Sequence, residues 1–319
     1  MKRYDVAALG ELLIDFTESG FSAQGNPLLE VNPGGAPCNV LAMLRKLGRN
    51  CAFLGKVGND SFGKLLRETV NSCGIETKGL LYDDEIPTTL AFVHTLAGGE
   101  REFSFYRKPG ADIRLSKEDL DMEILKNCRI FHFGSLSLTD EPCRTATACA
   151  LSTAKAAGAW ISFDPNLREP LWKELRDAKA EIAWGLARTD ILKISDNELL
   201  FMTGKEDFDE GVRVLRTQYP NLRLIFVTAG EGGSFAYYEG LRVFAPIIVM
   251  ENTIEKTGAG DTFCGCALHG VLEHGLENWS EAELLTLLRF ANAAAAIITT
   301  RKGAIRSMPE LSEIKALLG

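Results

Sequence analysis

Short runs of β-branched and aromatic residues alternate with amphipathic helical patterns along most of this chain. The runs predict strands at residues 4–9, 51–57, 129–133, 160–163, 191–194, 224–228, 233–238 and 241–245. The helical patterns cover residues 38–47, 63–73, 142–157, 207–218, 262–274 and 281–299. A strand followed by a helix, repeated many times, builds a mainly parallel sheet covered on both faces. The sequence therefore predicts an α/β fold, and without a linker or repeat we expect one domain over residues 1–319.

Two segments, about residues 12–33 and 86–112, interrupt this alternation with half-polar strands that have no helix between them. We expect them to form a small antiparallel lid that projects from the main sheet. Such a lid would close over the crevice at the carboxyl ends of the strands and shield it from water. Its apolar strands, with Phe92, Val93 and Phe105, would leave an unpaired edge in a single chain, so a homodimer through the lid is expected.

The charge, the apolar runs and the cysteines of the chain limit the classes of partner and cofactor that we expect. With 35 Lys and Arg against 43 Asp and Glu, the net charge is −8, and the basic residues are scattered, so we expect no nucleic-acid partner. No stretch reaches the roughly 18 consecutive apolar residues of a membrane helix, so we expect no membrane contact and a cytoplasmic location. The 8 cysteines lack metal-ligand spacing and are expected to be buried free thiols.

The segment Gly258, Ala259, Gly260, Asp261 opens a helical pattern. Small residues at a helix start leave backbone N–H groups accessible, and the helix dipole favours negative charge there, so this is a phosphate site. Asp261 is then a general base beside the anion, or alternatively a simple N-cap. A dinucleotide fingerprint lacks its third glycine here, and the chain contains neither a P-loop nor a nucleophile elbow.

A second glycine segment, at residues 32–39, precedes another strong helix pattern. Gly34 and Gly35 let the backbone approach a ligand, and Asn39 places an amide on the first helical turn. Asp15, at the end of the first strand region, offers a carboxylate that can accept hydrogen bonds from two neighbouring hydroxyl groups of a sugar. The alternative is a tight turn beside a solvated aspartate.

These segments together resemble the ribokinase-like (PfkB) sugar kinases over essentially the full chain, and most closely the fructokinases among them. Residues 34–39 are similar to the family's first signature, and residues 258–261 to its second. Residues 105–112, 163–168 and 193–198 resemble fructokinases in particular. The resemblance implies a three-layer ribokinase-like fold, with a mainly parallel central sheet and a small β-sheet lid.

Residue roles follow from the resemblance on the sugar side of the site. It implies that Asp261 deprotonates the sugar hydroxyl while Gly258, Ala259 and Gly260 form the anion hole for the transferred phosphoryl group. The residues implied to hold the sugar are Asp15, Gly34, Gly35, Asn39, Phe92, Phe105, Arg107 and Arg168.

On the nucleotide side, the resemblance implies ATP as co-substrate and Mg²⁺ as cofactor, with Glu198 organising the water shell of the metal. The residues implied to contact the nucleotide are Lys193, Thr228, Gly230, Gly233 and Asn292. K⁺ is a further candidate cofactor, although Glu255 and Lys256 replace the Asp and Thr that many relatives carry before the glycines. Ser195 likewise replaces the first Asn of the relatives' Asn-x-x-Glu motif.

The function indicated is an ATP-dependent kinase that converts D-fructose to fructose 6-phosphate. Three related activities stay open, namely kinases for 2-keto-3-deoxygluconate, ribose or a nucleoside, because a sequence does not display how a pocket reads hydroxyl positions. A non-catalytic sugar-binding regulator is the alternative from another class, and Asp261 with its intact glycine turn argues against it.

Overall fold

The computed structural model describes residues 2–95 and 101–319 and contains two sheets of different size. The large sheet has nine strands in the order β13-β12-β11-β10-β9-β8-β1-β4-β5. Its strands are β1 (Tyr4–Leu9), β4 (Cys51–Gly58), β5 (Glu76–Asp83), β8 (Cys128–Gly134), β9 (Trp160–Asp164), β10 (Ile191–Ser195), β11 (Leu224–Thr228), β12 (Ser234–Tyr238) and β13 (Leu241–Ala245). Strands β5 to β11 of this order run parallel, and β12 and β13 add an antiparallel hairpin at one edge. The predicted mainly parallel sheet is confirmed.

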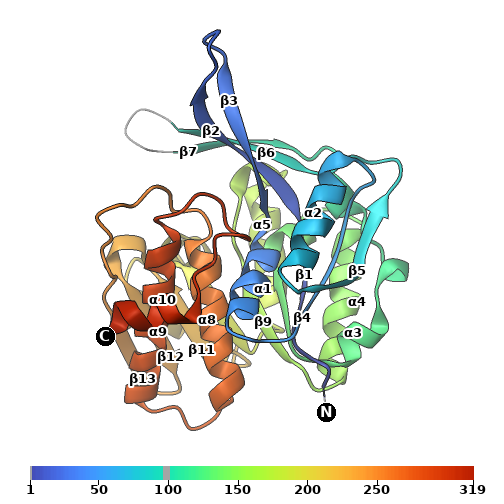
Figure 1. Cartoon of the computed structure of the whole chain (residues 1–319). Helices are drawn as coiled ribbons and strands as arrows, with labels where there is room; N and C mark the ends of the chain where they lie inside the picture. Colours follow the sequence, from blue (N-terminus) through green and yellow to red (C-terminus); the bar gives the residue numbers. More distant parts are fainter. Residues whose placement is uncertain (1, 96–100) are drawn as a thin grey trace.

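Helices cover both faces of this sheet (Figure 1). One buried apolar cluster contains side chains of α1 (Ala36–Lys46), α2 (Ser61–Ser72), α8 (Ala259–His274), α9 (Glu281–Ile298) and α10 (Leu311–Leu318). A second cluster, on the opposite face, contains side chains of α3 (Met122–Lys126), α4 (Cys143–Ala156), α5 (Leu175–Leu186), α6 (Asp196–Thr203) and α7 (Phe208–Gln218). The architecture is therefore three layers, α/β/α. Within the described part of the chain, no helix combines the length and the apolar character that crossing a membrane requires.

The lid is a separate four-stranded sheet that projects beyond the large one (Figure 1). Its strands are β2 (Leu13–Phe21), β3 (Pro27–Gly34), β6 (Leu90–Thr95) and β7 (Arg101–Tyr106), in the order β3-β2-β6-β7. Residues 96–100 of the expected lid segment lie outside the described residues. The prediction of an antiparallel lid is wrong at its centre, where β2 and β6 pair in parallel. The reason is that each half of the lid is its own hairpin, and both hairpins leave the body in the same direction.

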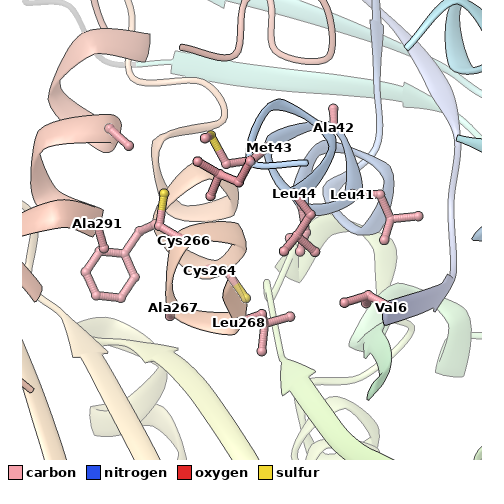
Figure 2. Packing of buried hydrophobic residues seen from close by; sticks show 14 of the residues in the cluster. Val6, Leu41, Ala42, Met43, Leu44, Cys264, Cys266, Ala267, Leu268 and Ala291 are labelled. Carbon is pink, nitrogen blue, oxygen red and sulfur yellow. The ribbon is translucent and has the colours of Figure 1, made fainter. Parts of the chain in front are cut away.

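Helices α1 and α8 pack unusually closely, and this contact positions the site. A Cβ atom on Gly265 of α8 would lie 2.8 Å from Cβ of Met43 and 3.0 Å from the carbonyl oxygen of Val40 on α1. Only glycine leaves room for two helix backbones at this distance. Leu41, Met43, Cys264 and Leu268 surround the contact in the buried cluster (Figure 2). The first turns of the two helices are thereby held side by side.

Candidate functional site

A cavity of about 510 Å³ opens where the lid meets the carboxyl ends of the parallel strands. Its lining comes from the lid, from the first turns of α1 and α8, and from the loops after β9 and before α8. The sequence-predicted residues that the structure brings together there are Asp15, Gly35, Asn39, Phe105, Arg168, Lys193, Gly258, Gly260 and Asp261. Segments separated by more than 200 residues therefore converge on one hollow, at the edge where parallel sheets bind ligands.

Asn39 and Asp261 form the centre of the cavity. The Asn39 side chain donates from Nδ2 to Oδ2 of Asp261 over 2.8 Å. Its other polar atom, Oδ1, is buried and has no hydrogen-bond partner within the described chain. An amide oxygen is an acceptor only, so a hydroxyl group beside Asn39 would donate a hydrogen bond to Oδ1 and keep its proton.

The electrostatic setting of Asp261 combines opposing effects. Burial raises the pKa of its carboxyl group, whereas the hydrogen bond from Asn39 and the charges of Lys193 and Arg168 lower it. A carboxylate that is partly desolvated but still held ionised by donors is a stronger base than one in water. Burial prevails, so the pKa of Asp261 is raised overall. The N-cap of α8 is Gly258 and not Asp261, and the general-base role of Asp261 stays a prediction.

Lys193 brings a positive charge beneath the start of α8. A Cβ atom placed on Gly260 would lie 3.1 Å from Nζ of Lys193, and Nζ itself is 3.0 Å from Oδ2 of Asp164 at the end of β9. Both side chains of this pair are less than a tenth exposed. Burial lowers the pKa of Lys193, but the charges of Asp164 and Glu198 outweigh it and raise the pKa overall. The ammonium is thus a permanent charge beside the amides of residues 258–260, and it stabilises Asp164 as a carboxylate although burial raises the pKa of that group.

One face of the lid looks into the cavity. The strand register places Asp15 opposite Ala91 and Ala91 opposite Phe105, so these three side chains share a face. Gly34 does not line the cavity itself; a Cβ atom at this position would lie 2.4 Å from Oδ2 of Asp15, so the glycine makes room for that carboxylate. Phe92 belongs to the opposite face, where its ring stacks on Phe16 with centroids 4.8 Å apart.

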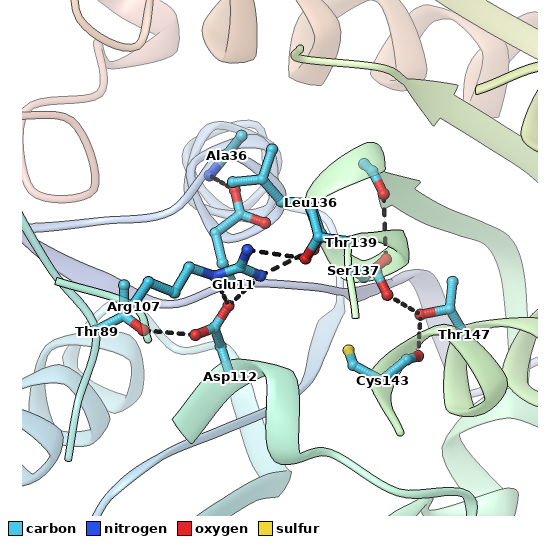
Figure 3. A network of polar contacts seen from close by, with 11 residues as sticks. Glu11, Ala36, Thr89, Arg107, Asp112, Leu136, Ser137, Thr139, Cys143 and Thr147 are labelled. Atoms are coloured by element: carbon cyan, nitrogen blue, oxygen red, sulfur yellow. Dashed lines mark hydrogen bonds and ion pairs between the residues drawn. The ribbon is translucent and has the colours of Figure 1, made fainter. Parts of the chain in front are cut away.

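Arg107 also lies outside the cavity lining, immediately below the lid. Its side chain is only 3% exposed and donates from Nε to Oδ2 of Asp112 (2.7 Å), from Nη1 to Thr139 (2.9 Å) and from Nη2 to the carbonyl of Leu136 (2.8 Å). Figure 3 shows how these bonds join Arg107 to its neighbours. The guanidinium is therefore committed to the protein, and the predicted contact of Arg107 with the sugar stays a prediction.

Glu198 occupies a structural position near the cavity. Its Oε1 accepts from the Leu167 N–H (2.7 Å) and its Oε2 from the Ser195 N–H (2.8 Å), while Ser195 caps α6 in return. This is a capping box, and it explains why a serine suits the first position of the Asn-x-x-Glu motif. Among the residues that the structure describes, no three His, Cys, Asp or Glu side chains converge as metal ligands. Glu198 is thus not part of a preformed metal cage.

Apart from Lys193, the expected nucleotide residues do not belong to the cavity lining. Thr228 ends β11, and Gly230 and Gly233 flank the tight turn that follows, both with positive φ. Asn292 on α9 bonds to the β12–β13 hairpin through Ser234, Ala245 and Pro246. Lys256 of the cavity loop reaches Glu231 of this turn over 3.5 Å, so the two regions are in contact. Ala259, the remaining predicted residue, is the first residue of α8.

Glu11 and Asp164 are site residues that the sequence analysis did not identify. Glu11 lines the cavity although it is buried, and Asp164 is the partner of Lys193. A signal existed for both, because a lone carboxylate inside or directly after an apolar strand pattern is expensive to bury without a specific partner.

Comparison with known proteins places the same elements in one family. The pattern described as pfkB family carbohydrate kinase matches residues 4–311. Fructokinase-1 of Zea mays is 40% identical over 315 residues, which cover 98% of this chain and 97% of that protein. Fructokinase-2 of Solanum lycopersicum is 41% identical over 315 residues, with 98% and 95% covered.

Solved structures of fructokinases are also similar to this chain. The chain is similar to fructokinase with bound ATP from Xylella fastidiosa, with a TM-score of 0.87, 29% identity and coverage of 99% of this chain and 98% of that one. It is equally similar to fructokinase from Vibrio cholerae O395 in a fructose, ADP and calcium ion bound form, with a TM-score of 0.87, 30% identity and 99% of both chains covered.

Proposed function

The chain belongs to the pfkB family of carbohydrate kinases, and from this premise we propose that it is a fructokinase that transfers the γ-phosphoryl group of ATP to fructose. The observation that carries the proposal is the Asn39–Asp261 pair at the first turn of α8, inside a cavity of sugar size. The full-length relatives named above support the same sugar. The products are fructose 6-phosphate and ADP.

Asp261 takes the proton of the reacting hydroxyl as its oxygen bonds to the γ-phosphorus. The bond from that phosphorus to the bridging oxygen breaks, and ADP leaves with the electron pair. Asn39 keeps the carboxylate ionised and oriented through its donated hydrogen bond. Phosphoryl transfer needs mainly positioning and charge stabilisation, which this arrangement supplies.

The amides of Gly258, Ala259 and Gly260 receive the negative charge that develops on the transferred group. They stand at the N-terminus of a 16-residue helix, whose dipole favours anions, and the Lys193 ammonium lies against Gly260. Arg168 lines the same side of the cavity and adds a second cation. These groups are in place before the substrate arrives, so little reorganisation is needed.

Mg²⁺ fits the charges around this site. The negative charges of Glu198 and Asp261 help to raise the pKa of the buried Asp164 carboxyl group, so a cation beside these carboxylates would be stabilised. In proteins, Mg²⁺ that is bound to nucleotide phosphates usually retains several waters and needs only one or two protein carboxylates. Glu198 and Asp164 would hold the ion here through those waters. When bound, the ion neutralises phosphate charge. K⁺ fits less well, because Glu255 is buried against the Gly303 N–H and Lys256 adds a positive charge to the same loop.

The lid face with Asp15 and Phe105 would contact the sugar from the lid side. The Asp15 carboxylate would accept hydrogen bonds from the sugar hydroxyl groups, and the Phe105 ring would cover the apolar face of the sugar. ATP would lie along Thr228, Gly230 and Gly233 toward Asn292. A homodimer through the lid is supported by its exposed apolar side chains, among them Phe21 and Leu28. All eight cysteines are free thiols, which suits a reducing, cytoplasmic setting.

The test is ADP release from MgATP with fructose, ribose, 2-keto-3-deoxygluconate and adenosine in parallel. We expect turnover on fructose and a loss of at least about 100-fold in Asp261→Asn, because a general base is removed. Asp177→Asn, an exposed carboxylate on α5, is the matched control and should leave turnover unchanged. Measurable sugar binding without turnover on any substrate would favour the non-catalytic regulator, and preference for another sugar would change the assignment.

A further inference from the structure

The four strands of the lid join the body of the protein at four points, and a polar side chain or a hydrogen-bonding backbone N–H group lies at each of them. Glu11 precedes β2, Ala36 follows β3 after one glycine, Thr89 precedes β6, and Arg107 follows β7. Figure 3 shows these residues gathered below the lid in one region. We call this group the lid roots.

Two of the lid roots are fixed to the body by Asp112. Thr89 donates to Oδ1 of Asp112 over 2.5 Å, and Arg107 donates to Oδ2 over 2.7 Å. Arg107 also donates to the Leu136 carbonyl on the body side. The β6–β7 half of the lid is therefore anchored by charge-assisted bonds in a buried setting, where such bonds are strong.

Glu11 performs the corresponding task for the β2–β3 half. Its Oε1 accepts from the Ala36 N–H over 3.0 Å, so it caps α1 from 25 residues away. The ordinary N-cap position is Gly35, which has φ of 129° and no side chain; a Cβ atom there would lie 2.3 Å from the Glu11 carbonyl oxygen. A side-chain cap at Gly35 is thus excluded, and Glu11 satisfies an N–H group at the start of α1 instead.

The hydrogen bond between Glu11 and Ala36 lies one helical turn before Asn39, the partner of Asp261. Ala36 is the first residue of α1, and Asn39 stands one turn later, with its N–H bonded to the Gly35 carbonyl over 2.9 Å. The Asn39 side chain in turn donates to Asp261. The second oxygen of Glu11, Oε2, is buried without a hydrogen-bond partner in the described chain, so the carboxyl group is held by few bonds besides the one to Ala36. A carboxyl group buried in this way costs free energy that packing alone does not explain.

We propose that Glu11 is a positioning residue for phosphoryl transfer, which holds the first turn of α1 so that Asn39 orients the base Asp261. The proposal rests on the function proposed above, in which Asp261 removes the hydroxyl proton. Because Glu11 also begins the β2 side of the lid, the same side chain connects the lid to the orientation of the base.

Kinetics of Glu11 variants test the proposal. We expect Glu11→Ala and Glu11→Asp to lower kcat about 10-fold with the KM for ATP unchanged, because the shorter arms do not reach the Ala36 N–H. Glu11→Gln keeps an acceptor oxygen at full length and should restore kcat. Asp207→Ala is the matched control: Asp207 caps α7 by accepting from the Glu210 N–H over 2.8 Å, and neither residue lines the cavity, so its loss should change stability and not kcat.

A double-mutant cycle decides whether Glu11 acts through Asn39. In an Asn39→Ala background, Glu11→Ala should cost no further kcat, since the group it positions is gone. Additive losses in the cycle, or failure of Glu11→Gln to restore kcat, would overturn the proposal.

Hydrogen exchange keeps this test separate from the function itself. The amides of residues 36–39 should exchange faster in Glu11→Asp than in the parent chain or in Glu11→Gln, whether or not any sugar is phosphorylated. Unchanged exchange would overturn the role of Glu11, whereas faster exchange without turnover on any sugar would count against the proposed kinase alone. The aspartate variant, which keeps the charge, serves where the alanine variant does not fold.

Discussion

The buried Lys193–Asp164 pair offers a quantitative test of the site. Replacing Lys193 by Met removes the ammonium and leaves Asp164 buried, beside the further carboxylates Glu198 and Asp261. At the 3.0 Å separation in the structure, two unit charges attract by about 5–6 kcal/mol with an effective dielectric constant of about 20. Breaking a buried pair by removing one partner typically costs about 3–5 kcal/mol. We therefore expect Lys193→Met to lower the free energy of unfolding by about 3–5 kcal/mol.

The double variant Lys193→Met/Asp164→Asn separates stability from catalysis. With no charge left unpaired, its free energy of unfolding should return to within about 1–2 kcal/mol of the parent chain. Its turnover should stay about 100-fold or more below the parent, because the cation beside Gly260 is still missing. Lys205→Met is the matched control, since the Lys205–Glu210 pair is half exposed and should contribute less than about 1 kcal/mol.

Urea denaturation measures the free energy of unfolding, and steady-state kinetics measure turnover, for the parent chain and the three variants. A double variant as unstable as Lys193→Met would show that the unpaired Asp164 charge is not the cause of the loss. A double variant with parent-level turnover would show that Lys193 acts only on stability, and the anion site would then consist of the α8 amides without this cation.

Two further predictions concern the lid roots and the lid surface. Burial raises the pKa of Glu11 from 4.5 to about 7. The positive charge of Arg107 lowers this pKa, and the negative charge of Asp112 adds a small increase. The folded chain then holds this proton more tightly than the unfolded chain, so the stabilisation is complete below pH 4.5 and is lost as the pH rises through 7. Between pH 4.5 and 8 the parent should lose about 3 kcal/mol of unfolding free energy relative to Glu11→Gln, and parallel pH curves in urea denaturation would contradict this. On the lid surface, Phe21 is 75% exposed, so Phe21→Arg should shift a lid-paired dimer toward monomer in sedimentation velocity; an unchanged sedimentation coefficient would argue against the lid interface.

The strands and helices predicted from periodicity are largely confirmed, because buried parallel strands and their covering helices carry strong patterns. The strand β5 was missed because its Glu76–Asp83 sequence mixes Gly and polar residues, as suits an edge strand. The helix α10 was missed because it has only 8 residues, and α5, with 12 residues, begins without a side-chain N-cap that would mark its start. The start of α9 at residue 281 was predicted correctly, and the structure shows a Ser280–Glu283 capping box there. The same pattern at Ser195–Glu198 was not predicted as a helix start, because Glu198 was assigned a metal role from the resemblance.

The lid shows why side-chain roles need more than local pattern. Phe92 and Phe105 were both expected on the sugar, but the register of β6 against β7 pairs Phe92 with Ser104 and Ala91 with Phe105. The two rings therefore point to opposite faces, and no single strand contains the information that fixes this register. Arg107 is comparable: its partners Leu136 and Thr139 come from a segment about 30 residues further along, so its burial follows only from the tertiary fold.

The orientation of the base depends on a contact in the core rather than on the site alone. Asn39 and Asp261 belong to helices that start at the same cavity, and their side chains stay at hydrogen-bond distance because Gly265 lets α8 approach Met43 of α1. In the proposed mechanism the small residues at the start of α8 bind the anion, while Gly265, four residues after Asp261, lets α8 lie where Asp261 reaches Asn39. Both tasks fall on one stretch of sequence, residues 258–265, which explains why glycines recur there at positions with different environments.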